Sequence, residues 1–209
     1  MATTHHADVP AHMLHDPPRS DSGPRISQGM LAMLLFIGSE VMLFASLFAA
    51  YFFVRFNIAD NVWPPYAPNG EQYHLPKLLT GINTAFLVAS SFTVWWAEHR
   101  LKHGDYKGLR RGLGVTILLG LTFLLIQVNE YVHLEFTPQT QAFGSTFYVL
   151  TGAHGFHVFA GLTLLIISYL RVRRGDFSPE WSTPLQAASA YWHFVDVVWV
   201  LLFVLVYLV

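Results

Sequence analysis

Five long apolar stretches dominate this sequence of 209 residues and limit what it can fold into. They run approximately over 29–54, 78–97, 113–132, 147–170 and 186–209. A helix needs about 20 apolar residues to cross the hydrocarbon core of a bilayer, and each stretch is that long. Because lipid offers no hydrogen-bond partners to an open backbone, each stretch must be helical. The sequence therefore predicts an all-α, polytopic membrane bundle of five transmembrane helices over 28–209.

The composition agrees with a membrane protein and excludes several other classes. Charged residues make up 12% of the chain, against roughly 25% in soluble proteins. The net charge of −1 gives no basic footprint for nucleic acid. The absence of cysteine excludes disulfides, iron–sulfur ligation and thiolate metal sites. No phosphate-binding glycine-rich loop, nucleophile elbow or zinc-protease motif occurs, so a soluble type of catalytic site is not expected.

The first 27 residues differ in composition from the rest of the chain. They are polar and contain four prolines, which favours a disordered cytoplasmic tail. They have no apolar core of the signal-peptide type, so no cleavage is expected. A metal-binding tail is the alternative, because four histidines lie here: His5, His6, His12 and His15.

The basic residues are distributed unevenly between the two ends of the predicted helices. Ten of the 12 lie in the N-terminal tail, in the second loop and in the fourth loop. The first loop has only Arg55 and Lys77, at its two ends, and the third loop has none. Since basic loops stay on the cytoplasmic side, the N-terminus is predicted in the cytoplasm and the C-terminus outside.

Several polar side chains interrupt the apolar stretches, although an ionisable group inside a membrane costs about 2.5–3.5 kcal/mol on insertion scales. Residues three apart share one face of a helix, so three pairs are predicted to form local hydrogen-bonded units. These pairs are His154 with His157, His193 with Asp196, and Gln127 with Glu130; Glu40 lies by itself in the first stretch.

Metal chemistry is one set of alternatives for these residues. A membrane haem needs histidines on two facing helices, which His154 or His157 together with His193 would supply. A di-metal carboxylate site needs two Glu-x-x-His motifs and two further glutamates, whereas the sequence has one such motif, at 130–133.

Proton handling is another alternative, with Glu40 or the His193 and Asp196 pair as the carrier. The structural alternative is that these groups satisfy one another at helix interfaces or bind lipid head groups. Small residues four apart, as in Ala45 with Ala49, let helices approach closely and favour a packed bundle. His157 with Gly161 follows the same spacing, and Ser90 and Ser91 are predicted to link helices.

The last stretch contains Tyr191-Trp192-His193-Phe194-Val195-Asp196-Val197-Val198-Trp199, which resembles the signature of subunit III of haem–copper terminal oxidases. Other segments match this family in the same order, from about residue 36 to residue 209. They are Gly38-Ser39-Glu40-Val41, Asn83-Thr84, Ala89-Ser90-Ser91, Trp96-Ala97, His99, Gly104-Asp105, Gln127-Val128-Asn129-Glu130-Tyr131, Gly144-Ser145-Thr146-Phe147-Tyr148 and Thr151-Gly152-Ala153-His154-Gly155-Phe156-His157-Val158.

The resemblance implies an accessory subunit without a metal or redox centre. Its partners would be oxidase subunit I, which holds the haems and copper, and subunit II, with electrons coming from cytochrome c or from quinol. The subunit is expected to stabilise the complex, bind phospholipid and support proton uptake. Glu40 matches the family's reactive membrane glutamate, and Arg171 matches a contact to a lipid head group, where a cation suits an anionic phosphate.

The sequence also departs from the family pattern. Many members have seven helices, and the two that are missing here form one wall of a lipid cleft. Ala153 stands where an aromatic residue is common, and His133 is atypical. The short form and polar tail favour a bacterial plasma membrane over a mitochondrial inner membrane. The alternatives are a quinol-oxidase or nitric-oxide-reductase-associated subunit, or a free-standing proton or solute transporter, although no inverted repeat supports the latter.

Overall fold

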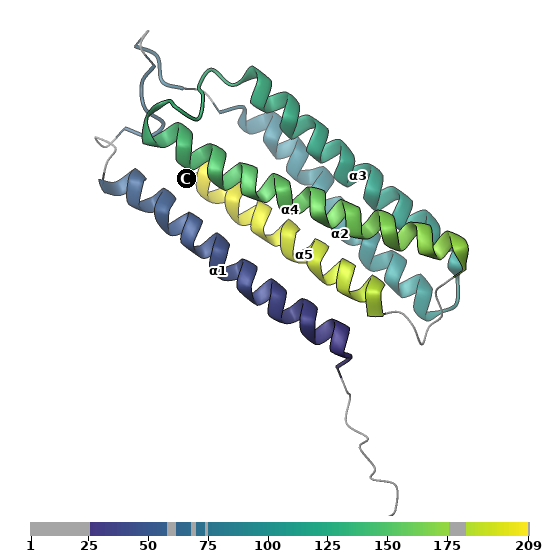
Figure 1. The fold of residues 1–209 in the computed structure, drawn as a ribbon. Coiled ribbons are helices and arrows are strands. Elements are labelled where there is room, and N and C mark those ends of the chain that lie inside the picture. The colour runs from purple at the N-terminus through teal and green to yellow at the C-terminus, as the bar shows by residue number, and fades with distance from the viewer. Residues whose placement is uncertain (1–25, 58–61, 68–69, 74, 176–182, 209) are drawn as a thin grey trace, which may run out of the picture.

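The chain forms a helical bundle in a computed structural model that describes residues 26–57, 62–67, 70–73, 75–175 and 183–208 (Figure 1). Its elements are α1 (Gln28–Asn57), α2 (Lys77–Lys102), α3 (Tyr106–His133), α4 (Gln141–Arg174) and α5 (Thr183–Leu202), and α5 continues into a π-helical turn, η3 (Phe203–Leu208). Within the described residues, five helices are long and apolar enough to cross a membrane, which confirms the predicted architecture. The predicted tail at 1–27, with its histidines, lies almost wholly outside the described residues.

The connection between α2 and α3 shows how local chemistry ends one helix and starts the next. Gly104 has a positive φ of 71°, which a residue without a side chain adopts at little cost. Asp105 then caps α3, because its Oδ1 accepts a hydrogen bond from the Gly108 amide at 2.9 Å. The three-residue connection makes α2 and α3 antiparallel neighbours, and the absent side chain of Gly112 lets α3 approach Ala97 of α2.

Trp192 of α5 fills the centre of the bundle, where three helices meet. Its side chain is fully buried, and it lies against Gly120 of α3 and Gly161 of α4. A Cβ atom at Gly120 would come within 2.6 Å of the Trp192 ring, and one at Gly161 within 2.8 Å. The predicted role of Gly161 in close helix packing is therefore confirmed.

Helix α1 is attached to the bundle along one side, where it packs against α4 and α5 (Figure 1). Only 6% of its most apolar window is buried, against 33–50% in the other four helices. Phe44 and Tyr51 are its buried residues. The expectation that Ala45 and Ala49 pack against a neighbouring helix is wrong within this chain, because both lie on the exposed side of α1.

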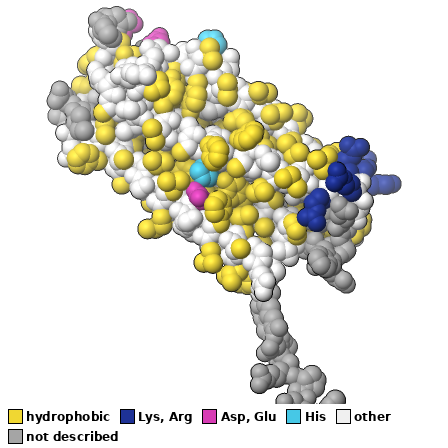
Figure 2. Space-filling view, viewed as in Figure 1, with side chains coloured by type: hydrophobic (Ala, Val, Ile, Leu, Met, Phe, Trp, Pro, Cys, Tyr) yellow, Lys and Arg dark blue, Asp and Glu magenta, His cyan; other side chains and the backbone are white. Residues whose placement is uncertain are grey.

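The two ends of the bundle differ in charge. Figure 2 shows the lysine and arginine side chains gathered at one end, with apolar side chains over the surface beyond them. This basic end is formed by the last turn of α2, the start of α3 and the last turn of α4. The asymmetry is the one that the sequence predicts, whereas the orientation of the bundle in a membrane remains a prediction.

Replacing Gly120 tests the central packing. We expect Gly120→Leu to lower the free energy of unfolding by about 1–3 kcal/mol, because the new side chain overlaps Trp192 in a filled core. The thermal midpoint of the purified protein in detergent measures the effect. Gly155→Leu is the matched control, since a Cβ there meets nothing within 4 Å. Equal midpoints for the two variants would contradict the assigned packing.

Candidate functional site

The first polar group inside the bundle joins α1 to α4. Nε2 of His157 lies 2.8 Å from Oε2 of Glu40, and both side chains are largely buried. Nδ1 of His157 lies 2.7 Å from the Ala153 carbonyl oxygen. Because a carbonyl only accepts hydrogen bonds, Nδ1 carries a hydrogen, and one further proton must lie between Nε2 and the carboxyl group. The pair therefore holds one shared proton and is neutral overall.

Aromatic rings surround this pair. The Phe44 ring meets the His157 ring edge-on at 5.0 Å between centroids, and the Tyr191 ring lies 6.5 Å away. These rings lower the local dielectric, which strengthens the attraction between the two groups. The sequence singled out both Glu40 and His157, but nothing in their spacing showed that they meet across 117 residues.

The second polar group joins α2 to α5. The Ser91 hydroxyl contacts Nδ1 of His193 at 3.1 Å and donates a short hydrogen bond to Oδ2 of Asp196. The predicted pairing of His193 with Asp196 is thus correct in part, because a serine from another helix bridges the two. Ser91 and Ser90 link helices as predicted, and Ser90 does so by accepting from Nε1 of Trp192 at 2.9 Å.

The third polar group lies near the end of the bundle opposite the basic end. Oε1 of Glu130 accepts a hydrogen bond from the Tyr207 hydroxyl at 3.0 Å, and Oε2 lies 3.2 Å from Oγ1 of Thr80. Glu130 also lines a pocket of about 250 Å³. The other residues that line it are Pro76, Leu79, Asn129, His133, Leu134 and Glu135. Glu130 is thus a buried acid beside a surface opening.

Two of the predicted local pairs are wrong. His154 is fully buried, but neither of its ring nitrogens has a hydrogen-bond partner among the described residues, and it packs instead on Phe123 and Trp199. The side chain of Gln127 is likewise buried, and it lies beside the Tyr207 hydroxyl rather than pairing with Glu130. Their neighbours three residues away, His157 and Glu130, turn to other helices.

The geometry does not assemble the metal sites that the sequence left open. His193 contacts Ser91 of α2, His157 contacts Glu40 of α1, and His154 packs on Trp199. Over the described ranges, no three His, Asp or Glu side chains gather closely enough to bind a metal ion. His133 instead bonds through Nδ1 to the Asn129 carbonyl of its own helix at 2.8 Å.

The last candidate from the sequence, Arg171, is remote from these groups. It lies on an exposed position in the last turn of α4, at the basic end, with Arg173 and Arg174. Sequence reasoning missed Thr80 and Tyr207 as partners of Glu130. Spacing along one helix shows which residues share a face, but not which helix that face meets.

Comparisons with known proteins identify the family of this chain. The sequence profile described as "Cytochrome c oxidase subunit III" matches residues 20–209. The chain belongs to the cytochrome c oxidase subunit III family. It is similar to cytochrome c oxidase subunit 3 of Drosophila yakuba, with 41% identity over 175 residues, 84% of this chain and 67% of the relative. It is 41% identical to that of Synechocystis sp. over 180 residues, covering 86% and 75% of the two chains.

The matched subunit III region contains all three polar groups. The subunit 3 of Bos taurus is 38% identical over 185 residues, which is 88% of this chain and 71% of the relative. Membership makes this chain a multi-pass subunit of a haem–copper oxidase complex, together with that complex's catalytic subunits. Relatives come from a cyanobacterium and from animals, so the choice between a bacterial and a mitochondrial membrane stays a prediction.

A double-mutant cycle tests the contact between Glu40 and His157. We expect Glu40→Ala and His157→Ala to be coupled by about 1–3 kcal/mol in the free energy of unfolding, since each leaves the other group buried and unpaired. Thermal midpoints of the two single variants and the double variant give this coupling. Glu40→Ala with Ser39→Ala is the control cycle, because the Ser39 hydroxyl bonds to its own helix at Phe36. Strictly additive effects for Glu40 and His157 would refute the pairing.

Proposed function

We propose that this chain is the non-catalytic subunit III of a respiratory oxidase that takes electrons from cytochrome c and reduces oxygen to water. The match to the family over residues 20–209 carries this proposal. Catalysis belongs to subunit I, which holds the haems and copper, with subunit II as the second partner. Quinol is the alternative electron donor, because the donor binds to another subunit.

We assign this subunit a stabilising role in the complex, supported by the exposed apolar surface of α1. Large apolar side chains are exposed along most of the helix, and a bilayer or a neighbouring subunit has to cover them. They are Leu31, Leu34, Leu35, Phe36, Val41, Met42, Leu43, Phe53 and Phe56. A helix attached along one side suits a position between the rest of the bundle and surrounding lipid or protein.

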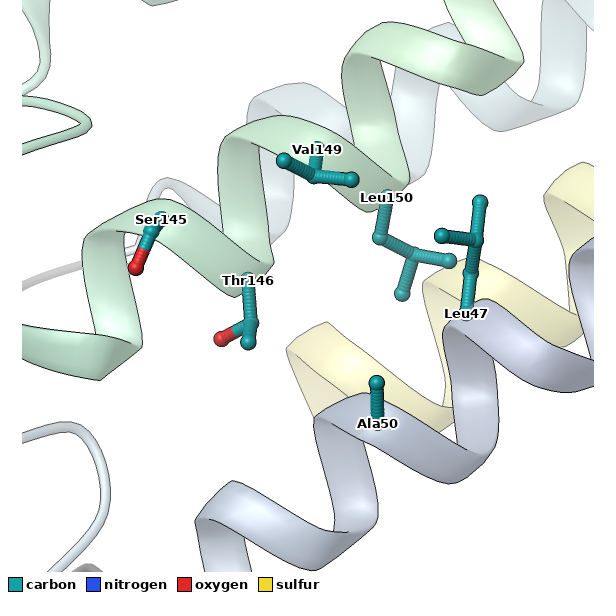
Figure 3. Close-up of a pocket in the computed structure, with 6 residues that line it drawn as sticks. All are labelled: Leu47, Ala50, Ser145, Thr146, Val149 and Leu150. Atoms are coloured by element: carbon teal, nitrogen blue, oxygen red, sulfur yellow. The ribbon is translucent and has the colours of Figure 1, made fainter.

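A groove between α1 and α4 supports the proposed binding of phospholipid. It has a volume of about 150 Å³ and is lined by the six residues drawn in Figure 3, among them Leu47, Val149 and Leu150. The hydroxyls of Ser145 and Thr146 bond to carbonyls of their own helix, which leaves an apolar wall. An acyl chain fits this wall, and Arg171, at the other end of α4, is assigned to the head group of a different lipid.

We assign the support of proton uptake to Glu40 and His157, because the pair holds one shared proton inside the membrane. The excess of basic residues at one end supports the proposal that this end, and the N-terminus, lie in the cytoplasm. The membrane is proposed to be a bacterial plasma membrane, with the mitochondrial inner membrane as the alternative.

Purification of the tagged chain in mild detergent tests the assembly. We expect it to bring down a large multi-helix subunit, identified by mass spectrometry, and to give haem bands in the optical spectrum. A colourless chain that stays monodisperse by itself would reject the accessory-subunit proposal and favour a free-standing transporter.

Continuous turnover tests the role of Glu40. In the assembled oxidase, we expect Glu40→Ala to leave the initial rate of oxygen consumption largely unchanged, since this chain holds no redox centre in the proposal. Sustained activity or the yield of assembled complex should fall, because His157 loses its partner. The matched control is Ser39→Ala, one residue away and bonded to its own helix. An immediate and complete loss of turnover in a fully assembled Glu40→Ala complex would contradict a supporting role.

A further inference from the structure

Two histidines lie on one face of α2 at the basic end of the bundle. His99 and His103 are four residues apart, so their side chains are neighbours on the surface of the helix. Both side chains are exposed, and both lie beyond the apolar stretch at 78–97. Metal ions dissolved in water can therefore reach them without crossing lipid.

The two imidazole rings are close together. Their centroids are 4.6 Å apart, with an angle of 48° between the ring planes. A metal ion bound to two imidazoles, at about 2.0–2.1 Å from each nitrogen and with an angle of about 90–110° between them, holds the ring centroids about 4.5–5.2 Å apart. The observed separation falls within that range, so the pair already has the spacing of a two-histidine chelate.

The tautomer of His103 follows from its contact with the backbone. Its Nδ1 lies 2.8 Å from the carbonyl oxygen of His99. Because a carbonyl only accepts hydrogen bonds, Nδ1 carries the hydrogen, and the lone pair of the neutral ring is on Nε2. Histidines that bind metal ions usually donate their other ring N–H to a carbonyl or carboxylate in this way, which fixes the ring for the ion.

The ring of His99 is restrained by two other rings. Trp95, one turn earlier on α2, stacks on it with 5.9 Å between centroids and 19° between ring planes. His103 is its neighbour one turn later. A side chain that is already restrained loses less conformational entropy when it binds a ligand, so this arrangement favours binding.

The charges next to the pair are compatible with a bound cation. The guanidinium group of Arg100 lies over the Trp96 ring at 4.8 Å, and its Nη1 is 3.5 Å from Oδ2 of Asp105, which offsets its charge. Lys102 is exposed, and water and salt weaken the repulsion from an exposed charge.

His133 of α3 has the same backbone contact without a second histidine. It is exposed, and its Nδ1 lies 2.8 Å from the carbonyl oxygen of the residue four positions earlier. That residue is Asn129, whose side chain offers no imidazole. His133 thus serves as a matched single-histidine comparison within the same chain.

We propose that His99 and His103 bind one divalent transition-metal ion. Imidazole suits Zn²⁺, Ni²⁺ and Cu²⁺, and Cu²⁺ binds most tightly of these to a given nitrogen site. A catalytic zinc site has three protein ligands, whereas this pair supplies two, so water molecules complete the coordination of the ion. The ion links the last turn of α2 to the residue that follows it, and its binding stabilises this end of the helix. This site goes beyond the proposed function, because it needs no other subunit.

Titration of the full chain with Cu²⁺ tests the site. The chain is purified in detergent through a tag without histidine, and the four histidines of its first 27 residues are replaced by alanine so that they do not compete. Pulsed EPR counts the imidazoles bound to Cu²⁺, and we expect two. His99→Ala or His103→Ala should weaken binding by at least about tenfold, since loss of even a supporting contact weakens metal sites by about 10–100-fold.

His133→Ala is the matched control, and it should leave the affinity for Cu²⁺ unchanged. Thermal midpoints measured without metal show whether each variant is folded. If an alanine variant is unstable, His99→Gln and His103→Gln give the same test, because glutamine keeps a polar side chain without an imidazole.

The outcomes are decided on the chain by itself. Two imidazoles on Cu²⁺, lost in both pair variants and kept in His133→Ala, support the site. A signal from a single imidazole, or equal affinity in all three variants, overturns it. The proposed function is read separately from the haem bands and the co-purified catalytic subunit, so either proposal can fail without the other.

Discussion

Lipid supplies no hydrogen bonds, so the protein itself must satisfy each polar group that it carries into the membrane. Hydroxyl groups form their hydrogen bonds within their own helix. Ser39, Ser46 and Thr163 are exposed on their helices, and each donates to a carbonyl oxygen three or four residues back. A carboxylate accepts only, and the amides of its own helix are already bonded. Glu40, Glu130 and Asp196 therefore need donors from other helices, and they receive them from His157, Tyr207 and Ser91.

Contacts between helices of this kind fix how the helices are rotated and how far each is shifted along its neighbour. Apolar packing by itself tolerates small rotations, whereas a hydrogen bond with one donor and one acceptor does not. Helices α2 and α5 are held at three levels, since Trp199 donates to Thr84, Trp192 to Ser90 and Ser91 to Asp196. Helix α1 has little buried surface, so the contact between Glu40 and His157 of α4 contributes more to its position than such a contact does for the other helices.

The sequence predicts the helices of this structure well and the contacts between them poorly. The five helices follow from the length and composition of the apolar stretches, which depend on each residue separately. The hydrogen-bond partners of the polar side chains do not follow from these features. A spacing of three residues suggested that His154 pairs with His157, whereas His157 contacts Glu40 of α1. The helices of Glu130 and Tyr207 meet only in the folded bundle, where residues 77 positions apart are in contact. The family resemblance pointed to the same residues without showing these contacts.

The polar groups of Asp196 and of Glu130 are separated by large rings. Asp196 and Tyr207, the partner of Glu130, are eleven positions apart along α5 and η3, or about 16 Å of helix. Trp199 lies within that interval, fully buried against Phe123, with its Nε1 already donated to Thr84. An indole has no second hydrogen to pass on and no acceptor, so it cannot relay a proton. Trp199 therefore does not connect the Asp196 group to the Glu130 group by hydrogen bonds.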